Sequence, residues 1–177
     1  SVLRLYEGYK MGVRTIPLEV MVQFATPFET MPIPQSHVII DANGTAQNID
    51  LYDISTWKKN QWSVFSPAFS QQIKTEQPDP ALAEKRVIAL QDKFSLNLAT
   101  ARKIQTALSA PFVDGNTEIA LFGGDCIDTR FRVLAELRNG HIQLFGEAGD
   151  LEKKSPNVDY QYLLYGPGDG LVTRASQ

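Results

Sequence analysis

The sequence predicts an α/β protein, because three patterns divide the chain into a mainly helical part and a strand-rich part. A long apolar stripe at helical spacing runs through residues 81–110. Short apolar runs separated by glycine-containing turns follow it. An Asn43-Gly44 pair between two short apolar runs predicts one small β-hairpin in the first part. We therefore expect a mainly helical region with this hairpin at residues 1–110 and sheet strands at residues 111–177.

Residues 1–30 are expected to be helical. Their apolar residues recur at helical spacing, and Pro17 suits the first turn of a second helix in this region. The strands of the small hairpin are expected at residues 37–40 and 49–53, on either side of the Asn-Gly turn. Pro27, Pro32 and Pro34 are expected to interrupt regular structure before the hairpin.

Two helices and a linker are expected after the hairpin. Ser55 is a suitable cap for a short helix at residues 56–60. The polar, proline-containing residues 66–80 predict a linker. Residues 81–110 form the longest periodic segment and predict an amphipathic helix. The apolar stripe of this helix consists of Val87, Leu90, Phe94, Leu98, Ala101, Ile104 and Leu108.

Four strands are expected in the second part of the chain. The apolar run at residues 118–122 predicts a short buried strand. Residues 131–137 and 141–145 flank an Asn139-Gly140 pair and predict a second hairpin. The aromatic and aliphatic residues 160–165 predict the last strand.

Composition and charge indicate a folded domain and exclude several classes of function. The net charge is −3, with 43% hydrophobic and 21% charged residues, which favours a folded core and gives no basic surface for nucleic acid. No apolar run approaches the roughly 18 residues that a transmembrane helix needs. The N-terminus lacks the basic and apolar segments of a signal peptide. One cysteine, Cys126, cannot form an internal disulfide and leaves the cellular compartment open.

The glycine-rich segment after the last apolar run contains one acidic residue, Asp169. In acyl-transfer enzymes, a carboxylate at this kind of strand end holds the catalytic histidine in the tautomer that the reaction requires. Gly168 and Gly170 give the backbone the freedom that a sharp turn needs. Asp and Gly are also typical of ordinary turns, which have no catalytic role. By itself, the segment therefore favours a plain turn over a catalytic loop.

Three segments, in matching order, resemble the lecithin:cholesterol acyltransferase-like α/β-hydrolases. The segment Gly168-Asp-Gly-Leu-Val-Thr-Arg-Ala-Ser176 is similar to the family's Gly-Asp-Gly-Thr-Val-x-x-x-Ser, with Leu171 in place of the usual Thr. The segment Ile49-Asp-Leu-Tyr-Asp-Ile-Ser-Thr-Trp57 resembles the Asp-Leu-Tyr-Asp-x-x-Thr-Trp stretch of the cap. The segment Leu121-Phe-Gly-Gly-Asp-Cys126 resembles the glycine segment that precedes the acid-bearing strand. The resemblance covers most of residues 18–177 and favours a catalytic loop over a plain turn.

The resemblance implies a partial α/β-hydrolase fold, with a cap at residues 1–110 and late sheet strands that carry the acid loop at residues 111–177. It also implies a serine-dependent lipid acyltransferase or esterase that acts on an acyl ester or lipid, uses no cofactor or metal, and has Asp169 as its catalytic acid. The alternative is a non-catalytic binding module on a degenerate scaffold.

The chain contains no Gly-x-Ser-x-Gly nucleophile elbow. Since the triad of this fold runs Ser, Asp, His along the sequence, the serine is expected before Ser1 and the histidine after Gln177. The chain is thus expected to be an internal piece of a longer enzyme and inactive by itself. Unpaired strand edges predict self-association or contact with the missing N- and C-terminal segments.

The histidines are expected to be structural or solvent-facing, and the cysteine is expected to be structural. His37 and His141 both precede the acid, so the resemblance gives neither a catalytic role, and without neighbouring cysteines they do not indicate a zinc site. Cys126 lies near Asp125 and Asp128, an unfavourable setting for a thiolate nucleophile, which predicts a buried cysteine.

Three aromatic residues in the expected cap have two interpretations. Trp57, Trp62 and Phe65 either line an acyl-chain pocket or form the cap's own core. Because aromatic side chains serve mostly in packing, the core is the favoured interpretation.

Overall fold

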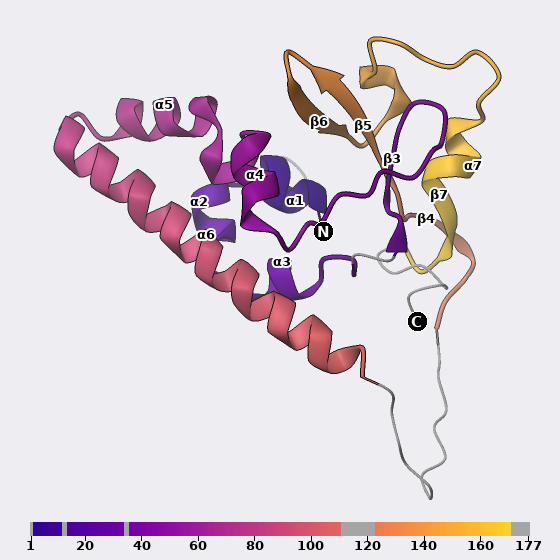
Figure 1. The fold of residues 1–177 in the computed structure, drawn as a ribbon, viewed down its shortest axis with the longest axis horizontal. Coiled ribbons are helices and arrows are strands. Elements are labelled where there is room, and N and C mark those ends of the chain that lie inside the picture. Colours follow the sequence, from indigo (N-terminus) through magenta and orange to yellow (C-terminus); the bar gives the residue numbers. More distant parts are fainter. Residues whose placement is uncertain (1, 12–13, 34–35, 111–122, 171–177) are drawn as a thin grey trace, which may run out of the picture. The chain divides into compact units, whose positions relative to one another are not determined.

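The computed structural model describes residues 2–11, 14–33, 36–110 and 123–170 of the chain (Figure 1). Helices and strands both occur, so the mixed α/β class predicted from the sequence is confirmed. The chain divides into two units, which we name the helical unit and the strand unit. The helical unit comprises Ser1–Ser36, Ile49–Ser109 and Leu137–Gln143. The strand unit comprises His37–Asn48, Ala110–Glu136 and Leu144–Gln177.

The helical unit begins with short helices and a two-stranded hairpin rather than with helix throughout. These elements are α1 (Val2–Glu7), β1 (Tyr9–Met11), β2 (Arg14–Ile16), α2 (Leu18–Met21) and α3 (Thr26–Glu29). Strands β1 and β2 pair in antiparallel register, so the helical prediction for residues 1–30 is wrong over the hairpin. Gly8 ends α1 with a φ of 91°, a backbone angle that a side chain disfavours. A Cβ atom on Gly8 would also lie 3.0 Å from the carbonyl oxygen of Ile16.

Helix α4 (Ile54–Lys59) confirms the short helix predicted after the hairpin, but its cap residue differs from the prediction. The carboxylate of Asp53 accepts a hydrogen bond from the Ser55 amide at 2.9 Å, so Asp53 caps the helix and Ser55 lies inside it. Hydrogen bonds from the Ser55 hydroxyl and amide lower the pKa of the Asp53 carboxyl. A short 3₁₀ helix, η2 (Ser63–Phe65), follows.

The linker predicted at residues 66–80 is wrong, because helix α5 (Pro67–Glu76) occupies most of this segment. The Ser66 hydroxyl accepts a hydrogen bond from the Phe69 amide at 3.1 Å, and Pro67 lies in the first turn, where a missing N–H costs nothing. Phe69 and Ile73 are buried against the unit. Two apolar residues one helical turn apart are therefore enough to hold an otherwise polar segment as a helix.

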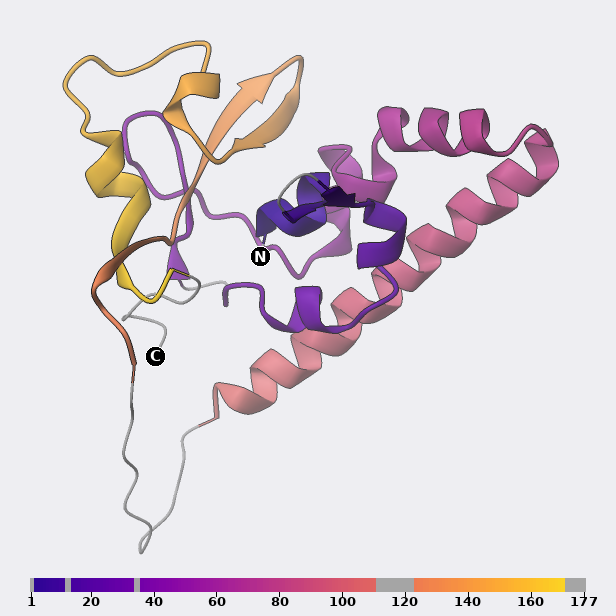
Figure 2. The ribbon, with the colours of Figure 1, turned by 180° about the vertical axis from the view of Figure 1, so that it is seen from behind.

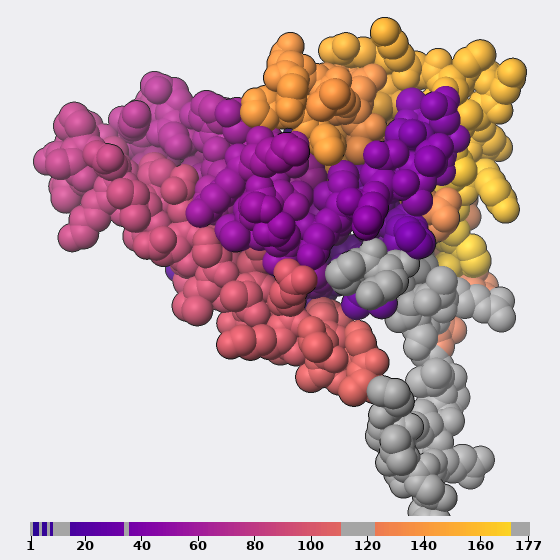
Figure 3. All heavy atoms as spheres, viewed as in Figure 1, coloured from indigo at the N-terminus to yellow at the C-terminus, as the bar shows by residue number. Residues whose placement is uncertain are grey.

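Helix α6 (Pro80–Leu108) confirms the longest predicted helix (Figures 1 and 2). The Asp79 carboxylate caps it by accepting hydrogen bonds from the amides of Ala81 and Leu82. The predicted stripe is buried from Val87 to Ala101, whereas Leu108 at the end of the helix is 73% exposed. The outer side of α6 stays at the surface along its length (Figure 3).

The core of the helical unit is aromatic. Phe28, Trp57, Trp62 and Phe94 are each at most 1% exposed, and their rings meet in edge-to-face contacts. The indole of Trp57 donates a hydrogen bond to the carbonyl oxygen of Leu51 at 2.8 Å, so its polar atom is satisfied. The two tryptophans thus form core, as the favoured interpretation of the sequence had it, and Phe65 is half-buried beside Phe94.

Tyr52 gives this unit a pH-dependent stability. The side chain is 4% exposed, and its hydroxyl donates to the carbonyl oxygen of Met31 at 2.9 Å. Burial, with the Asp50 carboxylate as a second cause, raises the pKa of Tyr52 from 10.0 to about 12. Because the unfolded chain ionises at the lower pKa, the free energy of unfolding should fall as the pH rises from about 10 to about 12.

The replacement Tyr52→Phe should remove this decline, since phenylalanine carries no ionisable proton. Urea unfolding of both proteins, measured below and within that pH window, checks the expectation. If the two proteins lose the same free energy of unfolding over the window, Tyr52 is not the group responsible.

A three-stranded sheet has the order β3-β5-β6, where β3 is Ile39–Ile40, β5 is Val133–Arg138 and β6 is His141–Phe145. The Asn139-Gly140 turn joins β5 to β6 with φ angles of 51° and 81°, as a type I′ turn requires, so the second predicted hairpin is confirmed. The strand predicted at residues 118–122 lies outside the described residues.

The first predicted hairpin is wrong in its pairing. Strand β3 pairs in parallel with β5, and Ile40 makes one isolated antiparallel bridge to Ala46. The turn around Gly44 does form, and the Gly44 amide donates to the carbonyl oxygen of Asp41 at 3.0 Å. Residues 49–53 make a turn instead of a strand, because the Asp50 carboxylate accepts a hydrogen bond from the Tyr52 amide at 2.8 Å.

The last predicted strand, residues 160–165, is mostly helix α7 (Tyr160–Leu164), and the strand β7 (Tyr165–Gly168) follows it. The Asp159 carboxylate caps α7 by accepting a hydrogen bond from the Tyr162 amide at 3.1 Å. Strand β7 pairs in antiparallel register with β4 (Ile127–Arg130), and a short 3₁₀ helix, η3, spans Ala148–Asp150. The core of the strand unit consists of Ile40, Leu134, Leu151 and Leu164.

Candidate functional site

Asp169 lies directly after the carboxyl end of β7, on a short segment that we name the acid loop (residues 168–170). Gly168 is buried at the end of the strand, whereas the Asp169 side chain is exposed. Asp169 makes an isolated bridge with Ile127 on the neighbouring strand β4. The strand-end position expected for a catalytic acid is therefore present, although the strand that leads to it begins later than predicted.

A buried threonine fixes the acid loop to β4. Thr129 is 2% exposed, and its Oγ1 accepts a hydrogen bond from the Gly170 amide at 2.8 Å. The same hydroxyl donates to the carbonyl oxygen of Ile127 at 3.0 Å. Gly170 has a φ of 92°, so the residue after the acid must be one that tolerates a left-handed backbone. No sequence pattern points to Thr129, because a lone threonine in a strand is common.

The glycine segment that precedes β4 contacts the acid loop. A Cβ atom built on Gly124 would lie 3.2 Å from the Cβ atom of Asp169, closer than most real Cβ contacts. The structure thus brings together Gly124 and Asp169, which belong to two of the three segments that carry the family resemblance. Residues 121 and 122 of the glycine segment, and residues 171–176 after the acid, lie outside the described residues.

Cys126 is exposed, so the prediction of a buried cysteine is wrong. Its Sγ lies 3.6 Å from a carboxylate oxygen of Asp125. All residues from Gly123 to Asp128 are exposed. The first buried residue after them is Thr129 in β4. The carboxylate of Asp125, one of the acidic neighbours predicted from the sequence, therefore lies beside the thiol.

Neither histidine belongs to the acid loop. His37 is exposed and precedes β3. His141 lies in β6, where its Nδ1 is 2.8 Å from the carbonyl oxygen of Lys59. In the part of the chain that the structure describes, no cluster of three or more His, Cys, Asp or Glu side chains could hold a metal ion.

The segment at residues 49–57, which resembles the family's cap motif, makes its contacts within the helical unit. Asp50 pairs with Arg102 at 3.1 Å, and Arg102 also donates to the carbonyl oxygen of Tyr52. Asp53 caps α4 and Trp57 is fully buried. Folding of the helical unit therefore accounts for the residue types at these positions.

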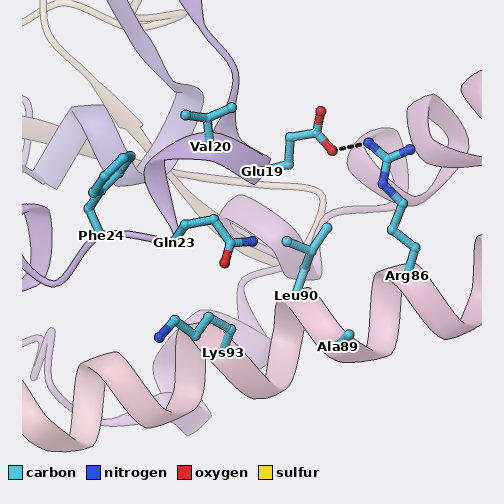
Figure 4. Close-up of a pocket in the computed structure, with 8 residues that line it drawn as sticks. All are labelled: Glu19, Val20, Gln23, Phe24, Arg86, Ala89, Leu90 and Lys93. Atoms are coloured by element: carbon cyan, nitrogen blue, oxygen red, sulfur yellow. Dashed lines mark hydrogen bonds and ion pairs between the residues drawn. The ribbon is translucent and has the colours of Figure 1, made fainter.

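A surface groove lies between α2 and α6 within the helical unit (Figure 4). It has a volume of about 590 Å³ and an apolar floor at Leu90, beside Phe24, which is 59% exposed. At one end Arg86 pairs with Glu19, and it also lies 3.6 Å from Glu76. No sequence pattern predicted this groove. Its remaining lining residues are Val20, Gln23, Ala89 and Lys93.

No family model, curated protein or solved structure matches this chain. Within the described residues, no helix has both the length and the apolar character of a membrane span. The candidate site consists of the acid loop and the two residues that contact it, Thr129 and Gly124.

Proposed function

We propose that this chain is part of a serine-dependent lipid acyltransferase or esterase in which Asp169 is the acid of a Ser-His-Asp triad. The observation that carries the proposal is an exposed carboxylate at the carboxyl end of β7, in a loop held by Thr129 and closely packed against Gly124. An ordinary surface turn requires neither contact, because its carboxylate needs no defined direction. The resemblance of the three segments supports the same assignment.

The proposed reaction is acyl transfer through a covalent intermediate. A serine attacks the carbonyl carbon of an acyl ester, and a histidine takes the serine proton and passes it to the leaving alcohol. Asp169 would accept a hydrogen bond from the far nitrogen of that histidine and stabilise the imidazolium while it is charged. Backbone amides would stabilise the oxyanion, and water or an alcohol would then release the acyl group. This chemistry needs neither metal nor cofactor.

The serine and the histidine would come from segments outside these 177 residues. The chain contains no nucleophile elbow, and its two histidines precede the acid, against the chain order of this fold. Among the described residues, β4 and β7 pair only with each other, so each offers an edge to a further strand. Strands of the longer enzyme, or of a second copy, would pair with those edges.

A non-catalytic binding module is the second candidate. The absence of a nucleophile elbow from the 177 residues favours it. The flanking sequence discriminates between the two functions, because only the enzyme needs a Gly-x-Ser-x-Gly upstream and a histidine downstream.

Ester hydrolysis tests the proposal directly. The purified 177-residue chain should not hydrolyse a p-nitrophenyl acyl ester, because it lacks the nucleophile and the base. The full-length enzyme, by which we mean the proposed longer protein, should release p-nitrophenol in a burst as the acyl-enzyme accumulates. Hydrolysis by the chain alone that a serine-directed inhibitor blocks would contradict the division of the triad. A full-length protein without any turnover would favour the binding module.

A further inference from the structure

We infer that Thr129 is a positioning residue for the catalytic acid, and that Gly124 provides the space this position requires. The inference rests on the proposed function of Asp169, and it assigns to β4 a role in catalysis that no sequence pattern indicates. Thr129 would act only through the acid loop, without touching the substrate.

The Thr129 hydroxyl both donates and accepts a hydrogen bond at a buried position. A hydroxyl has one donor and two acceptor sites, and Oγ1 uses its proton on the carbonyl oxygen of Ile127 and a lone pair on the Gly170 amide. The bond to the Ile127 carbonyl sets the direction of the hydroxyl proton, which leaves the lone pairs toward the acid loop. The threonine thereby links the strand backbone to the amide that immediately follows Asp169.

The acid loop needs such a link because glycines lie on both sides of Asp169. Gly168 and Gly170 have no side chains to limit their backbone angles, so the carboxylate would sample many directions without a fixed neighbour. A triad requires the carboxylate to be held within about 0.5 Å of its working position. The hydrogen bond to Thr129 restricts the residue after the acid, and the Ile127 bridge restricts the acid itself.

Gly124 limits the loop from a second direction. A Cβ atom on Gly124 would lie 3.2 Å from the Asp169 Cβ and 3.6 Å from its Cα. An alanine there would push the acid residue by a few tenths of an ångström or distort the glycine segment. Substitution of Thr129 and substitution of Gly124 change two independent contacts of the acid loop. Both are therefore expected to displace Asp169 and lower activity.

Thr129→Val and Thr129→Ser test the inference in the full-length enzyme. Valine has nearly the shape of threonine without its hydroxyl, so kcat for a p-nitrophenyl ester should fall by about 10- to 100-fold, with little change in KM. Serine keeps the hydroxyl and should retain most of the activity. Equal activity of the valine and wild-type enzymes would overturn the inference, as would an equal loss in both variants.

A double-mutant cycle separates this inference from the proposed function. If Thr129 acts through Asp169, then Thr129→Val should cause no further loss in an Asp169→Asn background. A similar fold-loss in both backgrounds would show that the threonine acts elsewhere, and the inference would fail alone. Full activity of Asp169→Asn by itself would refute the proposed function instead.

Gly124→Ala keeps the inference testable if the valine variant does not fold. This substitution leaves the Thr129 hydroxyl intact, yet it should lower kcat by about 10-fold through displacement of the acid. Thermal unfolding of each variant identifies loss of fold. A folded Gly124→Ala enzyme with wild-type kcat would contradict the tight packing on which the inference depends.

Discussion

Replacing Asp169 by asparagine in the full-length enzyme should lower kcat for an acyl ester by about 10⁴-fold. The amide keeps the size of the carboxylate but donates hydrogen bonds where an acceptor is needed, so the histidine is held in the wrong tautomer. KM should change little, because the acid does not contact the substrate. Steady-state turnover of a p-nitrophenyl ester measures both constants.

Asp128→Asn is the matched control for this prediction. Asp128 is exposed on β4, one residue before Thr129, and it pairs with Pro167 of β7 rather than with a residue of the acid loop. The substitution removes the same charge from the same strand pair and should leave kcat within about twofold of wild type, as expected of surface changes away from the site. Equal losses in the two variants would mean that charge, rather than the triad position, matters.

Phe94→Ala should destabilise the folded chain by about 3–5 kcal/mol. Phe94 is fully buried at the centre of the helical unit, and its ring contacts the rings of Phe28, Trp57 and Phe65. Truncation removes these contacts and leaves a cavity that the surrounding rings cannot fill without moving. Urea unfolding of the 177-residue chain, with the m-value compared between variants, measures the loss.

Leu96→Ala is the control, since it introduces the same alanine two residues further along α6. Leu96 is 61% exposed, so its truncation should change the free energy of unfolding by no more than about 0.5 kcal/mol. Comparable losses for the two substitutions would contradict the aromatic core described for this unit.

The elements that could be predicted from the sequence carry strong local signals. Helix α6 has an Asp79 cap and an apolar stripe sustained over many turns. The spacing of the apolar residues in this stripe fits an α-helix and no other type of secondary structure. The β5–β6 hairpin follows from its Asn139-Gly140 turn, whose two left-handed residues suit few other structures. Each of these signals lies within one continuous segment of the chain. Contacts with distant residues are therefore not needed to predict the element.

The elements that could not be predicted depend on caps or on distant partners. Residues 160–165 are apolar and aromatic enough for either a helix or a strand, and the Asp159 cap decides for α7. Ser66 and Pro67 are signals of a helix start at α5, but the polar composition of residues 66–80 favours a linker. The parallel pairing of β3 with β5 joins segments far apart in the sequence, so no local pattern reports it.

One residue of the candidate site, Asp169, can be predicted from the sequence. The contacts that hold it cannot. The glycine-rich segment and the family resemblance point to Asp169, and the structure places it at a strand end. Thr129 has no motif, and its contact with the acid loop arises only from the pairing of β4 with β7. Gly124 belongs to the glycine segment of the resemblance, but its close approach to Asp169 arises only in the folded chain.

The rate at which a fluorophosphonate labels the catalytic serine of the full-length enzyme tests the central claim most directly. This rate reports activation of the nucleophile by the histidine that Asp169 is proposed to orient, independently of ester binding and product release. We expect labelling of Asp169→Asn to be slower than wild type by at least about 100-fold, with Asp128→Asn close to wild type. Labelling of Asp169→Asn at the wild-type rate would show that Asp169 is not the acid of the triad.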